Sequence, residues 1–153
     1  MPTLDDVYRK FGETSEAAQL LETELGNILF SVGAMDADQL EQPAKARASD
    51  VLKFVNRQTL GQLLKSLNRS TDSIADLESL LERALTERNR LSHSFYREHN
   101  FRRNSDKGCA LMMEDLESIH RVLLNAYKAV MLQTGVDLDK ITIASLPTDH
   151  LPI

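Results

Sequence analysis

The segment that decides the fold runs from Cys109 to Val130 and reads CALMMEDLESIHRVLLNAYKAV. Its apolar residues recur at alternating intervals of three and four, at Cys109, Met112, Leu116, Ile119, Leu123, Ala126 and Val130. This pattern predicts a helix whose apolar seam packs nearly parallel or antiparallel to other helices in a bundle. A seam this regular is also typical of a helix at a dimer interface. Gly135 is a stop signal for the helix.

The same periodicity predicts helices upstream of this segment. A helix that begins near Asp72 or Ser73 and extends to Phe95 places Ile74, Leu77, Leu81, Ala84, Leu85 and Leu91 on one side. Residues 18–32 form a second amphipathic stretch, preceded by a short helix over 4–11 that Gly12 is expected to break. Between them we expect a polar loop over 34–49, a weaker helix over 50–56, and a short helix that begins at Thr59 with a capping box.

These segments predict an all-α fold, a four- to five-helix up-down bundle. At 153 residues the chain has the usual length of one domain. We expect that domain to span residues 1–135, with an extended tail over 136–153 and a polar, basic loop from His99 to Gly108. The composition, 42% hydrophobic and 27% charged with no Trp, is that of an ordinary globular helical protein.

Several classes of protein are disfavoured by the sequence. It has no basic stretch followed by an apolar run at its amino terminus, and no window of roughly 18 apolar residues. We therefore expect an intracellular, cytoplasmic protein without a membrane partner. Cys109 has no second Cys for a disulfide and no Cys or His at metal-ligand spacing, so we interpret it as a small core residue and predict no metal and no cofactor.

Charge is unevenly distributed along the chain. The net charge is −5, yet residues 83–107 contain seven basic and three acidic side chains, a local net charge of +4. Such a patch can bind a phosphate backbone while the rest of the surface keeps the protein in solution. A solvated loop of mixed charge is the alternative interpretation of the same residues.

Within this basic segment, Arg88 occupies an unusual position. On a helical wheel of about 100° per residue it falls on the line of Leu77, Leu81, Ala84 and Leu91. An arginine within an apolar stripe needs a carboxylate, backbone carbonyls, a bound anion or an opening to a cleft. The alternative to a functional role is a structural salt bridge with one of the many acidic residues.

Arg88, Asn89 and His93 can converge near the end of this helix, because Asn89 and His93 are four residues apart. An imidazole can act as the general base on the 2′-hydroxyl of RNA. An arginine can stabilise the charge that develops on the phosphate oxygens, and Asn89 would orient the histidine or the phosphate. An Arg-to-His spacing alone carries little information; its context in an amphipathic helix, followed by aromatic and basic residues, makes it a candidate site.

The run from Glu87 to Phe95, ERNRLSHSF, resembles the motif of the HEPN domains (higher eukaryotes and prokaryotes nucleotide-binding). The resemblance covers the motif helix and the helix after it, about a third of the chain. It implies a helical bundle that dimerises so that the arginine and histidine of both copies meet in one cleft. It also implies a metal-independent endoribonuclease of toxin–antitoxin or antiviral systems, with Arg88 and His93 as the catalytic pair and Asn89 beside them.

One position departs from part of the family. Some HEPN toxins carry a modifiable tyrosine two residues after the histidine, where this chain has Phe95 followed by Tyr96, so silencing by that route is not expected. The basic residues around the motif are the candidate RNA contacts, namely Arg90, Arg97, His99, Arg102 and Arg103.

The sequence is also compatible with two other functions. One is a non-catalytic module that binds a nucleotide, nucleic acid or protein, in which an acidic residue satisfies Arg88 and the cleft is closed. The other is an antitoxin or regulator that binds a protein partner through the seam of the last helix and the apolar tail.

Overall fold

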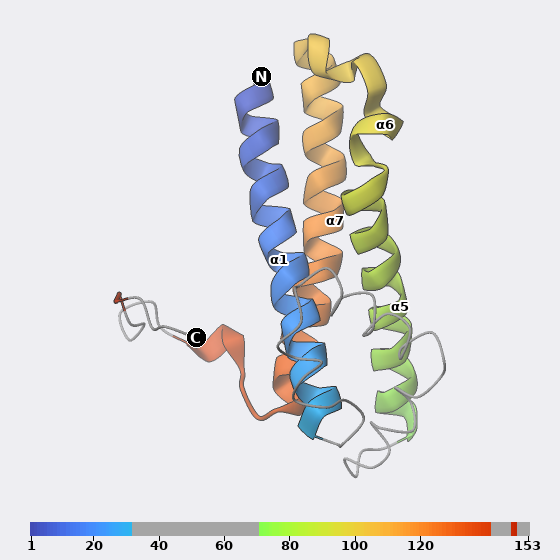
Figure 1. Ribbon diagram of the computed structural model, residues 1–153, viewed down its shortest axis with the longest axis vertical. Coiled ribbons are helices and arrows are strands. Elements are labelled where there is room, and N and C mark those ends of the chain that lie inside the picture. Colours follow the sequence, from blue (N-terminus) through green and yellow to red (C-terminus); the bar gives the residue numbers. More distant parts are fainter. Residues whose placement is uncertain (32–70, 142–147, 150–153) are drawn as a thin grey trace.

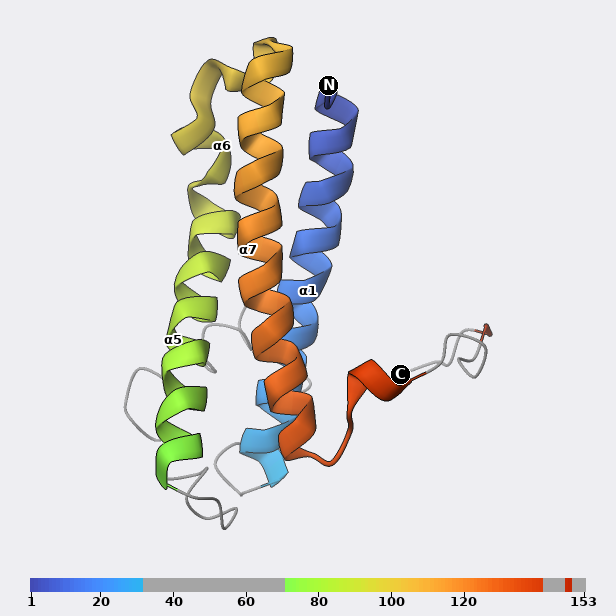
Figure 2. The ribbon, with the colours of Figure 1, turned by 180° about the vertical axis from the view of Figure 1, so that it is seen from behind.

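The computed structural model describes residues 1–31, 71–141 and 148–149, and these form helices and turns without a strand. Three long helices dominate this part of the chain: α1 (Leu4–Ser31), α5 (Thr71–His93) and α7 (Asp106–Gln133). Helix α7 packs against both α1 and α5, whereas α1 and α5 contact each other less. Helices α1 and α7 run in the same direction and α5 runs opposite to both (Figures 1 and 2).

The predicted seam of α7 is the centre of this bundle. All seven seam residues are buried, and Leu116, Ile119 and Leu123 are completely inaccessible. They pack against a core that includes Leu21 and Leu25 of α1 and Leu81 of α5. The chain's own helices therefore cover the seam, so the dimer interface or protein-binding surface expected along it is not exposed in this structure.

Helix α1 is continuous, and the expected break at Gly12 is wrong. Thr3 and Asp6 form a capping box at its start: the Thr3 amide donates to Asp6 Oδ2 at 2.8 Å, and the Asp6 amide donates to Thr3 Oγ1 at 3.3 Å. Gly12 is exposed, while Val7 and Thr14 on either side of it are fully buried. A glycine costs a helix only about 1 kcal/mol, which the burial of these neighbours offsets.

The helix predicted to begin near Asp72 or Ser73 begins at Thr71, and it is interrupted at Ser94. Its predicted apolar face is buried at Leu77, Leu81, Ala84, Leu85 and Leu91. The chain then continues as a short helix, α6 (Phe95–His99), and a 3-10 turn, η1 (Asn100–Asn104), so the expected loop from His99 to Gly108 is largely helical.

A tight backbone contact joins η1 to α7. A Cβ added to Gly108 would lie 1.9 Å from the carbonyl oxygen of Arg102, so only glycine fits there. Ser105 caps α7 by accepting a hydrogen bond from the Gly108 amide at 3.1 Å. These contacts fix η1 at the end of the bundle where α6 and the start of α7 meet (Figure 1).

The carboxyl end of α7 confirms the predicted stop. Gly135 has φ 88°, its amide donates to Leu132, and the Val136 amide donates to Met131, which together form a Schellman motif. The tail then forms a short 3-10 turn, η2 (Leu138–Lys140), where an extended chain was expected. The predictions for residues 34–70, including the helices over 50–56 and from Thr59, lie outside the described residues, as does most of the tail.

None of the helices in the described ranges is both long and apolar enough to cross a membrane. Cys109 is buried against the core, as expected for a structural cysteine.

Candidate active site

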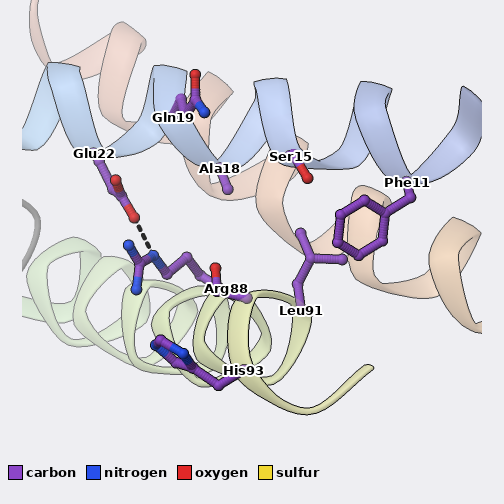
Figure 3. Close-up of a pocket in the computed structure, with 9 residues that line it drawn as sticks. Phe11, Ser15, Ala18, Gln19, Glu22, Arg88, Leu91 and His93 are labelled. Carbon is purple, nitrogen blue, oxygen red and sulfur yellow. Dashed lines mark hydrogen bonds and ion pairs between the residues drawn. The ribbon is translucent and has the colours of Figure 1, made fainter. Parts of the chain in front are cut away.

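The structure places Arg88 and His93 on the wall of one pocket, formed between α5 and α1. The pocket has a volume of about 400 Å³. Its lining from α1 comprises Phe11, Ser15, Ala18, Gln19 and Glu22, and its lining from α5 comprises Arg88, Leu91, Ser92 and His93. Figure 3 shows the two helices facing each other across this space, with Phe11 and Leu91 together on one side and the charged residues on the other.

Arg88 reaches the pocket from the apolar stripe of α5 and is mostly buried, with 15% of its side chain exposed. Its Nε donates a hydrogen bond to Glu22 Oε1, and the Glu22 side chain is itself 10% exposed (Figure 3). Its Nη1 donates to Asn89 Oδ1 at 3.1 Å. The expected need for a partner is thus met by a carboxylate from α1 and by the neighbouring amide.

These two bonds leave part of the Arg88 guanidinium available. A guanidinium has further N–H donors on both Nη atoms, and no hydrogen bond from Nη2 is present within the described residues. Because Glu22 approaches at Nε, it fixes the plane of the group from one side. The remaining N–H groups are the ones that could bind an anion in the pocket.

His93 ends α5, and its side chain is exposed. Its backbone carbonyl accepts from Arg97 at 3.2 Å, but its imidazole makes no hydrogen bond to any part of the chain that the structure describes. The ring is therefore free to bind a ligand. Asn89 is exposed and its side-chain oxygen accepts from Arg88, so it orients the arginine rather than the histidine.

A second hollow adjoins the pocket at His93. It is lined by Phe11 and by the continuous run from Leu91 to Arg97, so the two hollows share Phe11, Leu91, Ser92 and His93. Together they form a surface path from the Glu22–Arg88 pair to Arg97. Tyr96 on this path is partly buried, which raises the pKa of its hydroxyl.

Arg90, although only two residues from Arg88, belongs to a separate polar cluster. Its Nη1 and Nη2 donate to Asp115 at 2.8 and 2.6 Å, its Nη1 also to Glu98 at 3.0 Å, and its Nε to Glu87 at 3.0 Å. These bonds raise the pKa of Arg90 and lower that of Asp115. Because three carboxylates surround Arg90 and accept its hydrogen bonds, they offset its positive charge and weaken its attraction for RNA.

His99 belongs to the same cluster and is 4% exposed. Its Nε2 lies 2.7 Å from Asp115 Oδ2 and its Nδ1 lies 3.0 Å from Arg102 Nη1. Because a guanidinium can only donate, Nδ1 accepts the hydrogen bond from Arg102, and Nε2–H donates one to Asp115. Both ring nitrogens are thus occupied, and the expected contact of His99 with RNA has no free atom to make it.

The remaining candidate RNA contacts are exposed. Arg97, Arg102 and Arg103 have no carboxylate partner within the described ranges. Arg97 donates to the His93 carbonyl, Arg102 to the His99 ring, and Arg103 to the Tyr8 hydroxyl at 2.7 Å. They keep their positive charge on the surface beyond the pocket.

Sequence reasoning missed the α1 side of the pocket, and above all Glu22. A signal for Glu22 was present, since it lies in the apolar stripe of α1 between Ala18 and Leu25, where a carboxylate needs a cationic partner. Asp115 was missed in the same way, one residue from Leu116 of the α7 seam. As for metals, no group of three or more His, Cys, Asp or Glu side chains in the described part could hold an ion.

No protein-family model matches this chain, and the searches of curated proteins and of solved structures found no match either.

Proposed function

We propose that this protein is a metal-independent endoribonuclease of the HEPN type, in which Arg88 and His93 act on RNA at a cleft between two copies of the chain. The observation that supports the proposal most directly is that both residues line the same open pocket. Their separation in the sequence does not guarantee this, because five residues on a helix turn through about 500°.

The chemistry assigned to each residue follows from its environment. The free His93 imidazole acts as general base and takes the proton from the ribose 2′-hydroxyl. The 2′-oxygen attacks the adjacent phosphorus, the bond to the 5′-oxygen breaks, and the products are a 2′,3′-cyclic phosphate and a 5′-hydroxyl. The leaving oxygen receives its proton from a second acid, for which the His93 of the other copy is the candidate.

Arg88 stabilises the negative charge that develops on the phosphate oxygens. The hydrogen bonds to Glu22 and Asn89 hold its guanidinium before RNA binds, so less conformational entropy is lost when the phosphate arrives. In this proposal Glu22 and Asn89 are positioning residues, and Arg97 guides the RNA chain toward His93 from the adjoining hollow.

The Glu22–Arg88 ion pair also favours the second candidate function, a non-catalytic module that binds a nucleotide, nucleic acid or protein. A carboxylate beside the arginine reduces the attraction of the pocket for a phosphate. That module was expected to have a closed cleft, whereas the pocket here is open. The ion pair therefore agrees with the binding module and the open pocket agrees with the enzyme.

The deciding experiment is cleavage of a labelled RNA in EDTA by the parent protein and by His93→Ala. The matched control is His120→Ala, a histidine of α7 outside the pocket. Because the His93 side chain is exposed and unbonded within the described chain, its removal should leave the fold intact, which circular dichroism checks. We expect 2′,3′-cyclic phosphate ends from the parent and from His120→Ala, and uncut RNA with His93→Ala.

Uncut RNA with the folded, dimeric parent would reject the ribonuclease and leave the binding module. Cleavage that survives in His93→Ala would reject the assigned site. A sedimentation measurement tests the dimer separately, and a protein that is monomeric while it cleaves RNA would reject the shared cleft but keep the catalytic pair.

A further inference from the structure

Among the residues that the structure describes, Phe101 at the tip of the bundle is the most exposed large apolar residue after the terminal Met1. Phe101 is 77% exposed and stands in η1, directly before Arg102 and Arg103. A single exposed apolar residue is ordinary on a protein surface. What distinguishes Phe101 is that its backbone makes close contacts on both sides and that the two arginines after it lack carboxylate partners in the described part of the chain.

The backbone around Phe101 is fixed on both sides. The backbone amide of Asn100, before it, donates a hydrogen bond to the Tyr96 carbonyl. After it, the Arg102 carbonyl lies against Gly108 so closely that no side chain fits between them. The exposed Phe101 ring thus stands on a turn whose backbone makes contacts on both sides, which lowers the entropy that the turn would lose on contact with a ligand.

The arginines beside the ring are held by neutral groups. Arg102 donates to the buried His99 ring, and Arg103 donates to the Tyr8 hydroxyl. Neither bond cancels the positive charge. The acidic residues next to this segment in the sequence are Glu98, which is paired with Arg90, and Asp106 in the first turn of α7, while Asp115 lies on the far side of the His99 ring from Arg102. The tip therefore combines a flat apolar face with positive charge.

We propose that Phe101, Arg102 and Arg103 form a docking site for an unpaired nucleotide of single-stranded RNA, outside the catalytic pocket. The base stacks on the Phe101 ring, and the two arginines contact the flanking phosphates. Paired bases are already stacked in a duplex and cannot cover the ring, so the site selects single strands. The choice of RNA as the ligand rests on the proposed function.

The position of the tip fits such a role. The hollow beside His93 extends to Arg97 of α6, and α6 leads directly into η1. On the α1 side, Phe11 lines this hollow and Tyr8, one turn earlier, contacts Arg103. A single-stranded RNA bound at Phe101, Arg102 and Arg103 would thus lie along the same end of the bundle as the entrance to the pocket.

The test measures binding rather than cleavage, by fluorescence anisotropy of a labelled single-stranded RNA with the full chain carrying His93→Ala. In this background we compare Phe101→Ala, Phe101→Leu and Phe101→Trp, with Leu132→Ala as the control for loss of an exposed apolar side chain at the other end of α7. We expect Phe101→Ala and Phe101→Leu to weaken binding by roughly 5- to 100-fold and Phe101→Trp to retain it. Leu132→Ala should bind normally.

Unchanged affinity of Phe101→Ala would overturn the inference, as would normal binding by Phe101→Leu, which keeps apolar area but cannot stack. Equal affinity for duplex RNA, or no binding of RNA at all, would also overturn it. RNA cleavage by the parent protein tests the proposed function separately. If RNA binds at Phe101 but the parent does not cleave it, only the ribonuclease is rejected. If the parent cleaves RNA and Phe101→Ala does not weaken binding, only the docking site at Phe101 is rejected.

Discussion

Replacing Asp115 with asparagine should destabilise the protein, because Asp115 links α7 to both α5 and α6. Its carboxylate accepts two hydrogen bonds from Arg90 and lies 2.7 Å from His99 Nε2. The asparagine side chain would keep one oxygen acceptor but turn an NH₂ group toward donors that need an acceptor. Loss of one partner of a buried ion pair costs about 3–5 kcal/mol.

The expected cost here is smaller than that range. The Asp115 side chain is 24% exposed, and Arg90 keeps Glu87 and Glu98 as partners after the substitution. We therefore expect a loss of about 2 kcal/mol, equivalent to a fall in Tm of about 4–8 °C for a chain of this size. Thermal and urea unfolding followed by circular dichroism measure both values. The control is Asp139→Asn, which removes the exposed Lys128 pair and should cost less than about 1 kcal/mol.

The same substitution predicts a pH dependence. The hydrogen bonds from Arg90 lower the pKa of Asp115 below its ordinary value of 3.8 in the folded state. A depressed carboxyl pKa contributes stability that is fully present above the unfolded-state pKa and is lost as pH falls through the folded-state pKa. The difference in stability between parent and Asp115→Asn should thus be constant from pH 7 to about 5 and shrink below about pH 4. Equal stabilities at pH 7, or a difference that does not shrink in acid, would refute this account of the cluster.

Three further substitutions test other parts of the structure. Gly108→Ala should cost about 3 kcal/mol in urea unfolding because its Cβ would overlap the Arg102 carbonyl, and a neutral result would show that η1 is not held against α7. Glu22→Ala leaves Arg88 without its carboxylate and should lower stability by about 3 kcal/mol, so an unchanged urea midpoint would disprove the ion pair. Leu116→Ala should cost about 2–5 kcal/mol, since its fully buried side chain leaves a cavity; a loss below about 1 kcal/mol would contradict its central place in the core.

The helices could be predicted from the sequence where periodicity extends over many turns. The seam of α7 is an example, because alternating intervals of three and four leave no other regular arrangement that buries all of its residues. The break at Gly12 was predicted from a local signal and is absent, because burial of Val7 and Thr14 on one continuous helix outweighs the cost of a single glycine. A helix-breaking residue therefore does not predict the end of a helix when buried residues on both sides of it pack against the same core.

The candidate site was predicted only on its α5 side. The wheel position of Arg88 required a partner, but nothing local identified Glu22, which lies 66 residues earlier in the chain. The placement of His99 was wrong for a related reason. A histidine among arginines suggests an exposed basic loop. His99 is buried instead because it is hydrogen-bonded to the Asp115 carboxylate, which comes from α7. Partners distant in sequence decide which polar residues are buried.

The contrast between Arg88 and Arg90 shows why local charge is a poor guide to phosphate binding. The two residues are two positions apart on α5 and therefore point about 200° apart around the helix. Arg90 directs its donors to three carboxylates, while Arg88 meets one carboxylate at Nε and has Nη groups left at the pocket. The capacity of an arginine to bind a phosphate depends on the N–H groups that remain unpaired, so in this segment Arg88, and not Arg90, is the residue on which a ribonuclease would depend.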